Sequence, residues 1–210
     1  YLFGDSQNAY NGMAELQMGA PNATWEVSHK TDIGLDVEFF DRKIRLSADW
    51  FYEYRDQILL KRAQIPDIMG AAWGDTPWAN LGIMENRGVD GQIEFTGTTK
   101  RGFFYSVRGN FTYAKNKVIE DDTAKALFDY QNTRGHSTGL ALGYVAEGLF
   151  QSQEEIDNSP KQELGSYTVG DIKYKDLNDD GVINAYDRTW IGYPREPRLM
   201  FGFGFTFAWK

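Results

Sequence analysis

Residues 199–209 read Leu-Met-Phe-Gly-Phe-Gly-Phe-Thr-Phe-Ala-Trp, with a large apolar side chain at every second position. Successive side chains of a β-strand point to opposite faces of a sheet. A period of two therefore predicts a strand with one wholly apolar face. Such a strand needs neighbouring strands with the same alternation to form a sheet.

Four further segments alternate in the same way, namely residues 31–40, 43–54, 88–98 and 103–114. Each is about as long as the ~9–11 residues that a tilted strand needs to cross a bilayer. The apolar positions are expected to face lipid: Ile33, Leu35, Val37, Ile44, Leu46, Ala48, Ile93, Phe95, Val107, Phe111, Phe203 and Phe205. The polar positions between them are expected to face a lumen: Asp36, Arg45, Asp49, Glu94, Arg108 and Asn110.

The connections between these segments alternate in length. Residues 41–42 and 100–102 leave room only for tight turns, so each flanking pair of segments should form an antiparallel hairpin. Residues 55–87 and 115–198 are long loops. Short turns on one side and long loops on the other are typical of an all-β fold that is a segment of a large transmembrane antiparallel β-barrel, with periplasmic turns and extracellular loops.

Alternation alone also fits a second fold. A soluble extracellular β-sandwich, stabilised by calcium and binding glycan, would use the apolar face as its core. Aromatic residues at the strand ends (Trp50, Tyr52, Tyr54 and Trp209) favour the barrel, whose strands carry aromatic girdles at the membrane surfaces.

Composition narrows the class of protein. The 210 residues include 14 Phe, 12 Tyr and 22 Gly, which favours strands and tight turns. There is no cysteine, and a net charge of -8 without a basic stripe argues against nucleic acid as a partner. Mean hydropathy is negative, but this does not exclude a membrane, because alternating barrel strands average out as polar.

Residues 176–187 read Asp-Leu-Asn-Asp-Asp-Gly-Val-Ile-Asn-Ala-Tyr-Asp, the pattern of a calcium loop. The expected oxygen ligands are Asp176, Asn178, Asp180, the Val182 carbonyl, Asn184 and Asp187. Asp replaces the usual Glu at position 12, and a strand rather than a helix follows. The pattern predicts a weak structural Ca²⁺ site; the alternative is a solvent loop in which Asn and Asp side chains bond their own backbone.

The long loops hold some structure of their own but no catalytic signature. Residues 121–130 are expected to form a short helix, and Ser152 with Glu155 forms a capping box for another. The aromatics Trp73, Trp78 and Tyr186 offer surfaces on which sugar rings can stack; the alternative is that they pack the loops or a lid protein. With two histidines and neither a nucleophile elbow nor a phosphate loop, the chain is not expected to be an enzyme.

Several motifs occur in one order along nearly the whole chain: residues 21–26 (Pro-Asn-Ala-Thr-Trp-Glu), 32–36 (Asp-Ile-Gly-Leu-Asp), 80–89, 148–152 (Gly-Leu-Phe-Gln-Ser) and 170–192. This series resembles SusC/RagA-type TonB-dependent transporters. Asp90 stands where that family usually has Glu.

The resemblance implies a plugged barrel in the outer membrane, which imports oligosaccharides or peptides with energy from TonB. It also implies a SusD-like lipoprotein over the extracellular mouth. No counterpart of the N-terminal plug or of the TonB-contacting segment is found, and a plugged transporter barrel needs about 22 strands. Residues 1–210 are therefore expected to be a partial barrel from its later region, with 55–87 and 115–198 as extracellular loops.

Overall fold

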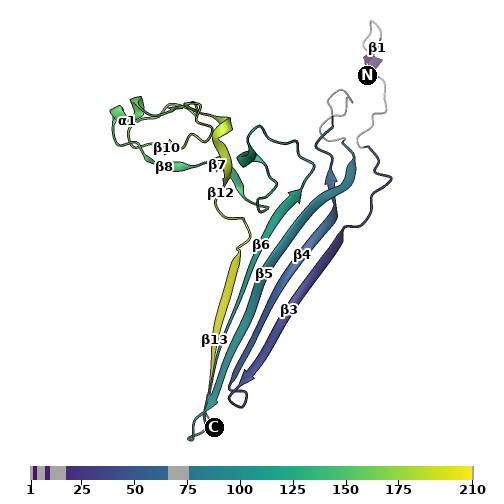
Figure 1. Cartoon of the computed structure of the whole chain (residues 1–210), viewed down its shortest axis with the longest axis vertical. Helices are drawn as coiled ribbons and strands as arrows, with labels where there is room; N and C mark the ends of the chain where they lie inside the picture. The colour runs from purple at the N-terminus through teal and green to yellow at the C-terminus, as the bar shows by residue number, and fades with distance from the viewer. Residues whose placement is uncertain (1, 4–7, 10–17, 66–75, 210) are drawn as a thin grey trace.

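The computed structural model describes residues 2–3, 8–9, 18–65 and 76–209. Five long strands form one antiparallel sheet, and a smaller lobe of short elements stands at one end of it (Figure 1). The sheet has the order β13-β6-β5-β4-β3. Its strands are β3 (Val27–Phe39), β4 (Ile44–Lys61), β5 (Trp78–Thr98), β6 (Phe103–Glu120) and β13 (Leu199–Trp209).

All five predicted strands are present, but four run further than the sequence indicated. Strand β3 begins at Val27, four residues before its predicted start. Residues 55–61, 78–87 and 115–120, which were expected in the long loops, belong to β4, β5 and β6. The alternation of apolar and polar side chains stops where the apolar face ends. The backbone hydrogen bonds between neighbouring strands do not depend on that alternation, so they continue beyond it. The connecting segments are therefore 62–77 and 121–198, both shorter than predicted.

Both predicted hairpins are confirmed, and their tight turns lie at the same end of the sheet, opposite the lobe (Figure 1). In the first turn Phe40, Asp41 and Arg42 adopt φ angles of 52°, 54° and 67°. In the second, Gly102 has φ 80° and donates its N–H to the Thr99 carbonyl at 3.0 Å.

The strand register confirms that the predicted apolar residues share one face. Leu46 lies opposite Val37 on one side and Ile93 on the other, and Phe95 continues the row from Ile44 to Val107. The predicted polar residues share the other face, where Arg45 lies 3.5 Å from Glu94.

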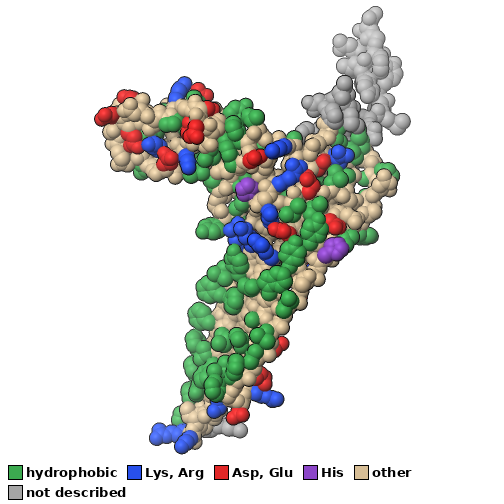
Figure 2. Space-filling view, in the orientation of Figure 1, with side chains coloured by type: hydrophobic (Ala, Val, Ile, Leu, Met, Phe, Trp, Pro, Cys, Tyr) green, Lys and Arg blue, Asp and Glu red, His purple; other side chains and the backbone are tan. Residues whose placement is uncertain are grey.

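No residue that the structure describes covers the apolar face, which rules out the β-sandwich. Ile33 is 64% exposed and Phe203 is 76% exposed, whereas a sandwich would bury both against a second sheet. Among the described residues, the buried apolar side chains are Val118, Phe150 and Ile183, none of them in the middle of this face. Figure 2 shows the hydrophobic side chains gathered along the lower sheet, with charged side chains beyond both ends.

The lobe follows β6 and precedes β13. Its elements are η2 (Asp129–Gln131), β7 (Ala141–Tyr144), β8 (Ala146–Leu149), α1 (Gln153–Asp157), β9 (Lys161–Gln162), β10 (Ile172–Tyr174), β11 (Val182–Ile183), η3 (Ala185–Asp187) and β12 (Arg188–Ile191). Strand β12 pairs with β7 and β10 pairs with β8, both antiparallel, while β11 pairs with β9 in parallel. Near the N-terminus, β1 (Leu2–Phe3) pairs with β2 (Asn8–Ala9).

The helix predicted over residues 121–130 is wrong. The Asp121 carboxylate accepts hydrogen bonds from both the backbone N–H and the hydroxyl of Thr123, and such local bonds compete with helical ones. Only the 3₁₀ turn η2 forms, at the far end of this segment.

Only half of the predicted capping box forms at α1. The Ser152 hydroxyl accepts the Glu155 N–H at 3.2 Å, as predicted, but the Glu155 carboxylate accepts from Gln151 at 2.9 Å rather than from Ser152. No helix in the described part of the chain is long and apolar enough to cross a membrane.

Candidate functional site

The cation-type loop is closed by the carboxylates at its two ends. Asp176 accepts the N–H groups of Asp179 and Gly181, both at 2.8 Å. Asp187 is fully buried and accepts the N–H of Leu177 at 2.9 Å and that of Asn184 at 2.8 Å. The side chain at each end of the loop is therefore hydrogen-bonded to backbone N–H groups of the loop itself.

The middle of the loop is a series of Asx-type turns. Asn178 Oδ1 accepts the Asp180 N–H at 3.2 Å, Asp180 Oδ1 accepts the Val182 N–H at 2.8 Å, and Asn184 Oδ1 accepts the Tyr186 N–H at 2.8 Å. Among the described residues, no group of three or more His, Cys, Asp or Glu is placed to hold a metal ion. These hydrogen bonds are the ones expected for the alternative to a calcium site, a solvent loop in which Asn and Asp side chains bond their own backbone.

Two other features of the loop agree with the calcium pattern. Gly181, at its sixth position, has φ +83°, a conformation that glycine adopts without strain. Ile183, at its eighth position, is fully buried where β11 pairs with β9, so it pins the loop to a neighbouring strand.

The loop concentrates negative charge beside Tyr130. Burial raises the pKa of the Tyr130 hydroxyl, and the charges of Asp187, Asp176 and Asp180 raise it further. That hydroxyl donates to the Tyr186 carbonyl at 2.7 Å, which ties η2 to η3. Across the described chain, no Lys, Arg or His forms a salt bridge with any of the three carboxylates.

Other hydrogen bonds that hold the lobe together were not predicted from the sequence. Gln131 donates to the Ala185 carbonyl at 3.0 Å, and the Trp190 indole N–H donates to the Asn132 carbonyl at 2.8 Å. The partners are more than 50 residues apart, and a pattern of neighbouring residues carries no signal for such contacts.

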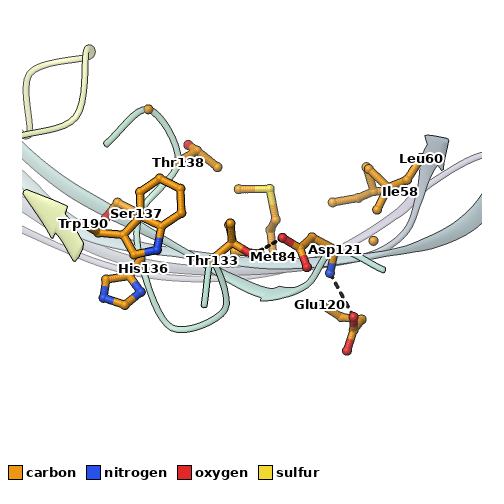
Figure 3. A pocket seen from close by; sticks show the side chains of 13 residues that line it. Ile58, Leu60, Met84, Glu120, Asp121, Thr133, His136, Ser137, Thr138 and Trp190 are labelled. Carbon is orange, nitrogen blue, oxygen red and sulfur yellow. Dashed lines mark hydrogen bonds between the residues drawn. The ribbon is translucent and has the colours of Figure 1, made fainter. Parts of the chain in front are cut away.

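An apolar crevice of about 320 Å³ lies where the lobe meets the upper sheet (Figure 3). Its sheet side is lined by Ile58, Leu60, Met84 and Val118, and its lobe side includes Thr133, His136 and Trp190. A crevice of this composition can hold an apolar group of a ligand or of a partner protein.

One edge of the crevice is charged. Burial raises the pKa of the Asp121 carboxyl, but hydrogen bonds from the hydroxyls of Thr133 and Thr123 outweigh this effect, so its pKa lies below the usual value. Asp121 is therefore an anion at neutral pH, fixed in place beside an apolar wall.

A second hollow of about 420 Å³, lined by both charged and apolar side chains, lies on the inner side of the same sheet end. Its lining includes Arg55, which is held by Glu53 at 2.7 Å and by Glu26 at 2.9 Å. Arg198 also lines it and donates to the Ser137 hydroxyl at 3.2 Å. Groups of both signs thus face the space that a polar solute would enter.

Two of the three predicted stacking aromatics, Trp78 and Tyr186, are described, and each contacts a different neighbour. The Lys61 ammonium lies 5.7 Å from the ring centre of Trp78, and Tyr186 packs edge-on against Phe128 with ring centres 5.9 Å apart. Trp73 lies outside the described residues.

Comparisons with known proteins agree with this geometry. The family model described as "TonB dependent receptor-like, beta-barrel" matches residues 2–207. TonB-dependent receptor P26 of Formosa agariphila is 29% identical over 224 residues, which cover 100% of this chain and 22% of that protein. TonB-dependent receptor SusC of Bacteroides thetaiotaomicron is 24% identical over 213 residues, covering 95% of this chain and 19% of that protein.

Solved structures show the same fold. The RagAB peptide transporter superposes with a TM-score of 0.64 at 17% identity, covering 92% of this chain and 20% of that one. The RagAB peptide importer in its open-open state gives 0.64 at 19% identity, covering 97% and 22%. The chain spans about a fifth of the length of the curated relatives it matches.

Proposed function

We propose, because the chain belongs to the TonB-dependent receptor-like β-barrel family, that it supplies part of the wall and the extracellular loops of an energised importer. It is SusC-like, and proteins of this kind lie in the outer membrane. The exposed apolar face of the sheet therefore meets lipid, the polar face meets the lumen, and the open edges β3 and β13 are where further barrel strands pair.

The observation that carries the proposal is the separation of these two faces together with the position of the lobe. The lobe stands at the end opposite the tight turns, which supports an extracellular position for it (Figure 1). There it can meet cargo and a SusD-like lipoprotein, while TonB acts from the periplasm on another part of the transporter. The charged side chains that line the hollow on the inner face, among them Glu53, Arg55 and Arg198, support a polar cargo, either an oligosaccharide or a peptide.

The test removes the lobe from the full-length transporter by replacing residues 121–197 with a short Gly-Ser linker. We expect the barrel to insert into the membrane, because β6 and β13 still pair. Its electrophoretic mobility should still differ between unheated and heated samples, as for a folded barrel. Uptake of labelled cargo and co-purification of the lipoprotein should both fall sharply. Oligosaccharide and peptide pools, offered in parallel to the unaltered transporter, identify the class of cargo; unchanged uptake after the deletion would contradict the proposal.

A Ca²⁺ ion in the 176–187 loop belongs to the proposed function as a structural element. The donors would be the side chains of Asp176, Asn178, Asp180, Asn184 and Asp187 with the Val182 carbonyl. Each carboxylate oxygen that accepts one backbone N–H keeps a further lone pair for a cation, so the donor set fits a hard ion. Bound there, the ion would offset three negative charges that have no basic partner among the described residues.

A further inference from the structure

The upper end of the lipid-facing surface carries a row of side chains that the transport function does not use. The register sets Thr31 beside Tyr52, Tyr52 beside Arg87, and Arg87 beside Lys115. All four occupy the same face as the apolar residues, because residues paired across neighbouring strands point to the same side.

This row lies directly above the apolar band. The row beneath it is wholly apolar or aromatic: Ile33, Trp50, Val89, Tyr113 and Leu199. From there down to the tight turns, the outward positions of β5 and β6 carry no charge. Eleven residues of β6, at about 3.4 Å each and a tilt of about 45°, give a band roughly 25 Å tall, the height expected for the lipid-facing band of a barrel.

Arg87 and Lys115 are therefore the first charges that a lipid headgroup layer would meet. Both side chains are exposed, and neither forms a salt bridge or side-chain hydrogen bond with any residue that the structure describes. The nearest outward acid, Glu85, is one row higher and pairs with Lys117 at 3.8 Å. In the space-filling view, Lys and Arg side chains gather just above the hydrophobic surface (Figure 2).

Two like charges directly opposite each other on adjacent strands repel, and the repulsion is unfavourable without an anion between them. We propose that Arg87 and Lys115 form a binding site for the phosphate of an outer-leaflet glycolipid headgroup. The guanidinium can hold two phosphate oxygens and the ammonium a third, while Tyr52 and Tyr113 border the site at the interface.

A lipid phosphate fits this position better than a protein does. The site faces outward from the wall at headgroup height, on β5 and β6, and β13 begins one row below Lys115. A lipoprotein over the mouth would meet the lobe and the strand ends instead.

The experiment uses the full-length transporter purified in an uncharged detergent. Phosphorylated lipid A, the same lipid with its phosphate removed, and inorganic phosphate are titrated against the unaltered protein. They are also titrated against Arg87→Gln/Lys115→Gln, with Lys100→Gln/Arg101→Gln in the opposite turn as the matched control. We expect phosphorylated lipid A to bind the double variant about thirtyfold more weakly, which corresponds to about five- to sixfold for each lost charge, and to bind the control as tightly as the unaltered protein.

A third variant, Arg87→Glu, guards against loss of folding. It replaces the like-charge pair by an opposite-charge pair with Lys115, so the barrel should be at least as heat-resistant as the unaltered protein while lipid binding is lost. Equal binding of phosphorylated lipid to both double variants, equal binding of the dephosphorylated lipid, or displacement by millimolar inorganic phosphate would overturn the proposal. So would loss of the lipoprotein partner from Arg87→Gln/Lys115→Gln with lipid binding intact.

Discussion

Asp187 is both an expected calcium ligand and a hydrogen-bond acceptor for the backbone of the loop. It ends the 176–187 loop, and its carboxylate, although fully buried, accepts the N–H groups of Leu177 and Asn184. A buried carboxylate is tolerated only where hydrogen bonds or a cation compensate the lost hydration. Asp187 therefore shapes the loop through the backbone whether or not an ion is present, which makes it a poor choice for testing the ion.

Asp180 and Asp179 provide a sharper test of calcium binding. Asp180→Asn and Asp179→Asn each remove one charge and keep the side-chain shape, but only Asp180 is an expected ligand. Calcium affinity depends on the charge of the ligands and should be on the order of 10⁻⁴–10⁻³ M. Calorimetry on the full-length transporter should show a loss of about tenfold or more for Asp180→Asn and a small change for Asp179→Asn. Equal effects of the two variants would mean that general charge, rather than coordination, is being measured.

Glu155 makes the N-terminus of α1 sensitive to acid. The N–H of Gln151 and then the ammonium of Lys173 lower the pKa of its carboxyl below the ordinary 4.5. Because the folded-state pKa is depressed, this contribution to stability is complete above the ordinary value and is lost as the pH falls through the lower, folded value. Hydrogen exchange at α1 should quicken in that window, and Glu155→Gln should show the quicker exchange already at neutral pH. Exchange in Glu155→Gln that matches the unaltered protein at neutral pH would contradict this role.

The long strands are divided into two parts by their surroundings. The lower part of β4 alternates strictly because one face meets lipid and the other the lumen. Beyond Arg55 the register with β5 shifts, and Gln57 adopts a φ of 54°. Above that point both faces meet water or loops, so nothing selects alternation, although the strand continues to Lys61.

Leu46 and Ser47 are adjacent residues of β4 that test the two faces at the same depth. Leu46 lies in the middle row of the apolar face, opposite Val37 and Ile93, whereas Ser47 lies opposite Asp36 on the polar face. Leu46→Arg should cost about 2–4 kcal/mol of barrel stability, the range for a basic residue near the bilayer midplane. Ser47→Arg gains a carboxylate neighbour and should be tolerated. Denaturant unfolding in lipid vesicles measures both; equal losses would show that the faces are wrongly assigned.

As a whole, the sheet of residues 1–210 is open, and its stability depends on what surrounds it. In the part of the chain that the structure describes, β3 and β13 each have one strand neighbour, and no residue covers the apolar face. Unpaired strand edges and uncovered apolar surface are unfavourable in water and promote association. Lipid and the neighbouring barrel strands supply what the segment lacks.

Expressed by themselves, residues 1–210 should aggregate in aqueous buffer and dissolve only with detergent. Light scattering and size-exclusion chromatography with and without detergent measure this, and the full-length transporter in the same detergent is the control. A soluble, cooperatively unfolding monomer would contradict the assignment of the apolar face to lipid.

Alternation along the chain was enough to predict the five strands, their two faces and the two hairpins, because burial in lipid acts on each side chain according to its own position. Short motifs predicted the roles of Gly181 and Ser152, which depend on conformation and bonds within a few residues. The limits of these predictions have the same origin. Where a strand leaves the bilayer, as after Arg55, neither face meets lipid, so apolar and polar side chains no longer need to alternate.

Only the tertiary structure decided how the lobe is built and which charges lack partners. The bond from Tyr130 to Tyr186 joins residues 56 apart, and the helix expected at 121–130 yields to side-chain bonds of Asp121. The pairing of Arg87 with Lys115 likewise depends on the register of two strands. Contacts of this kind depend on the path of the whole chain, since residues distant in sequence meet only after the strands have paired, whereas the faces of a strand follow from its neighbouring residues alone.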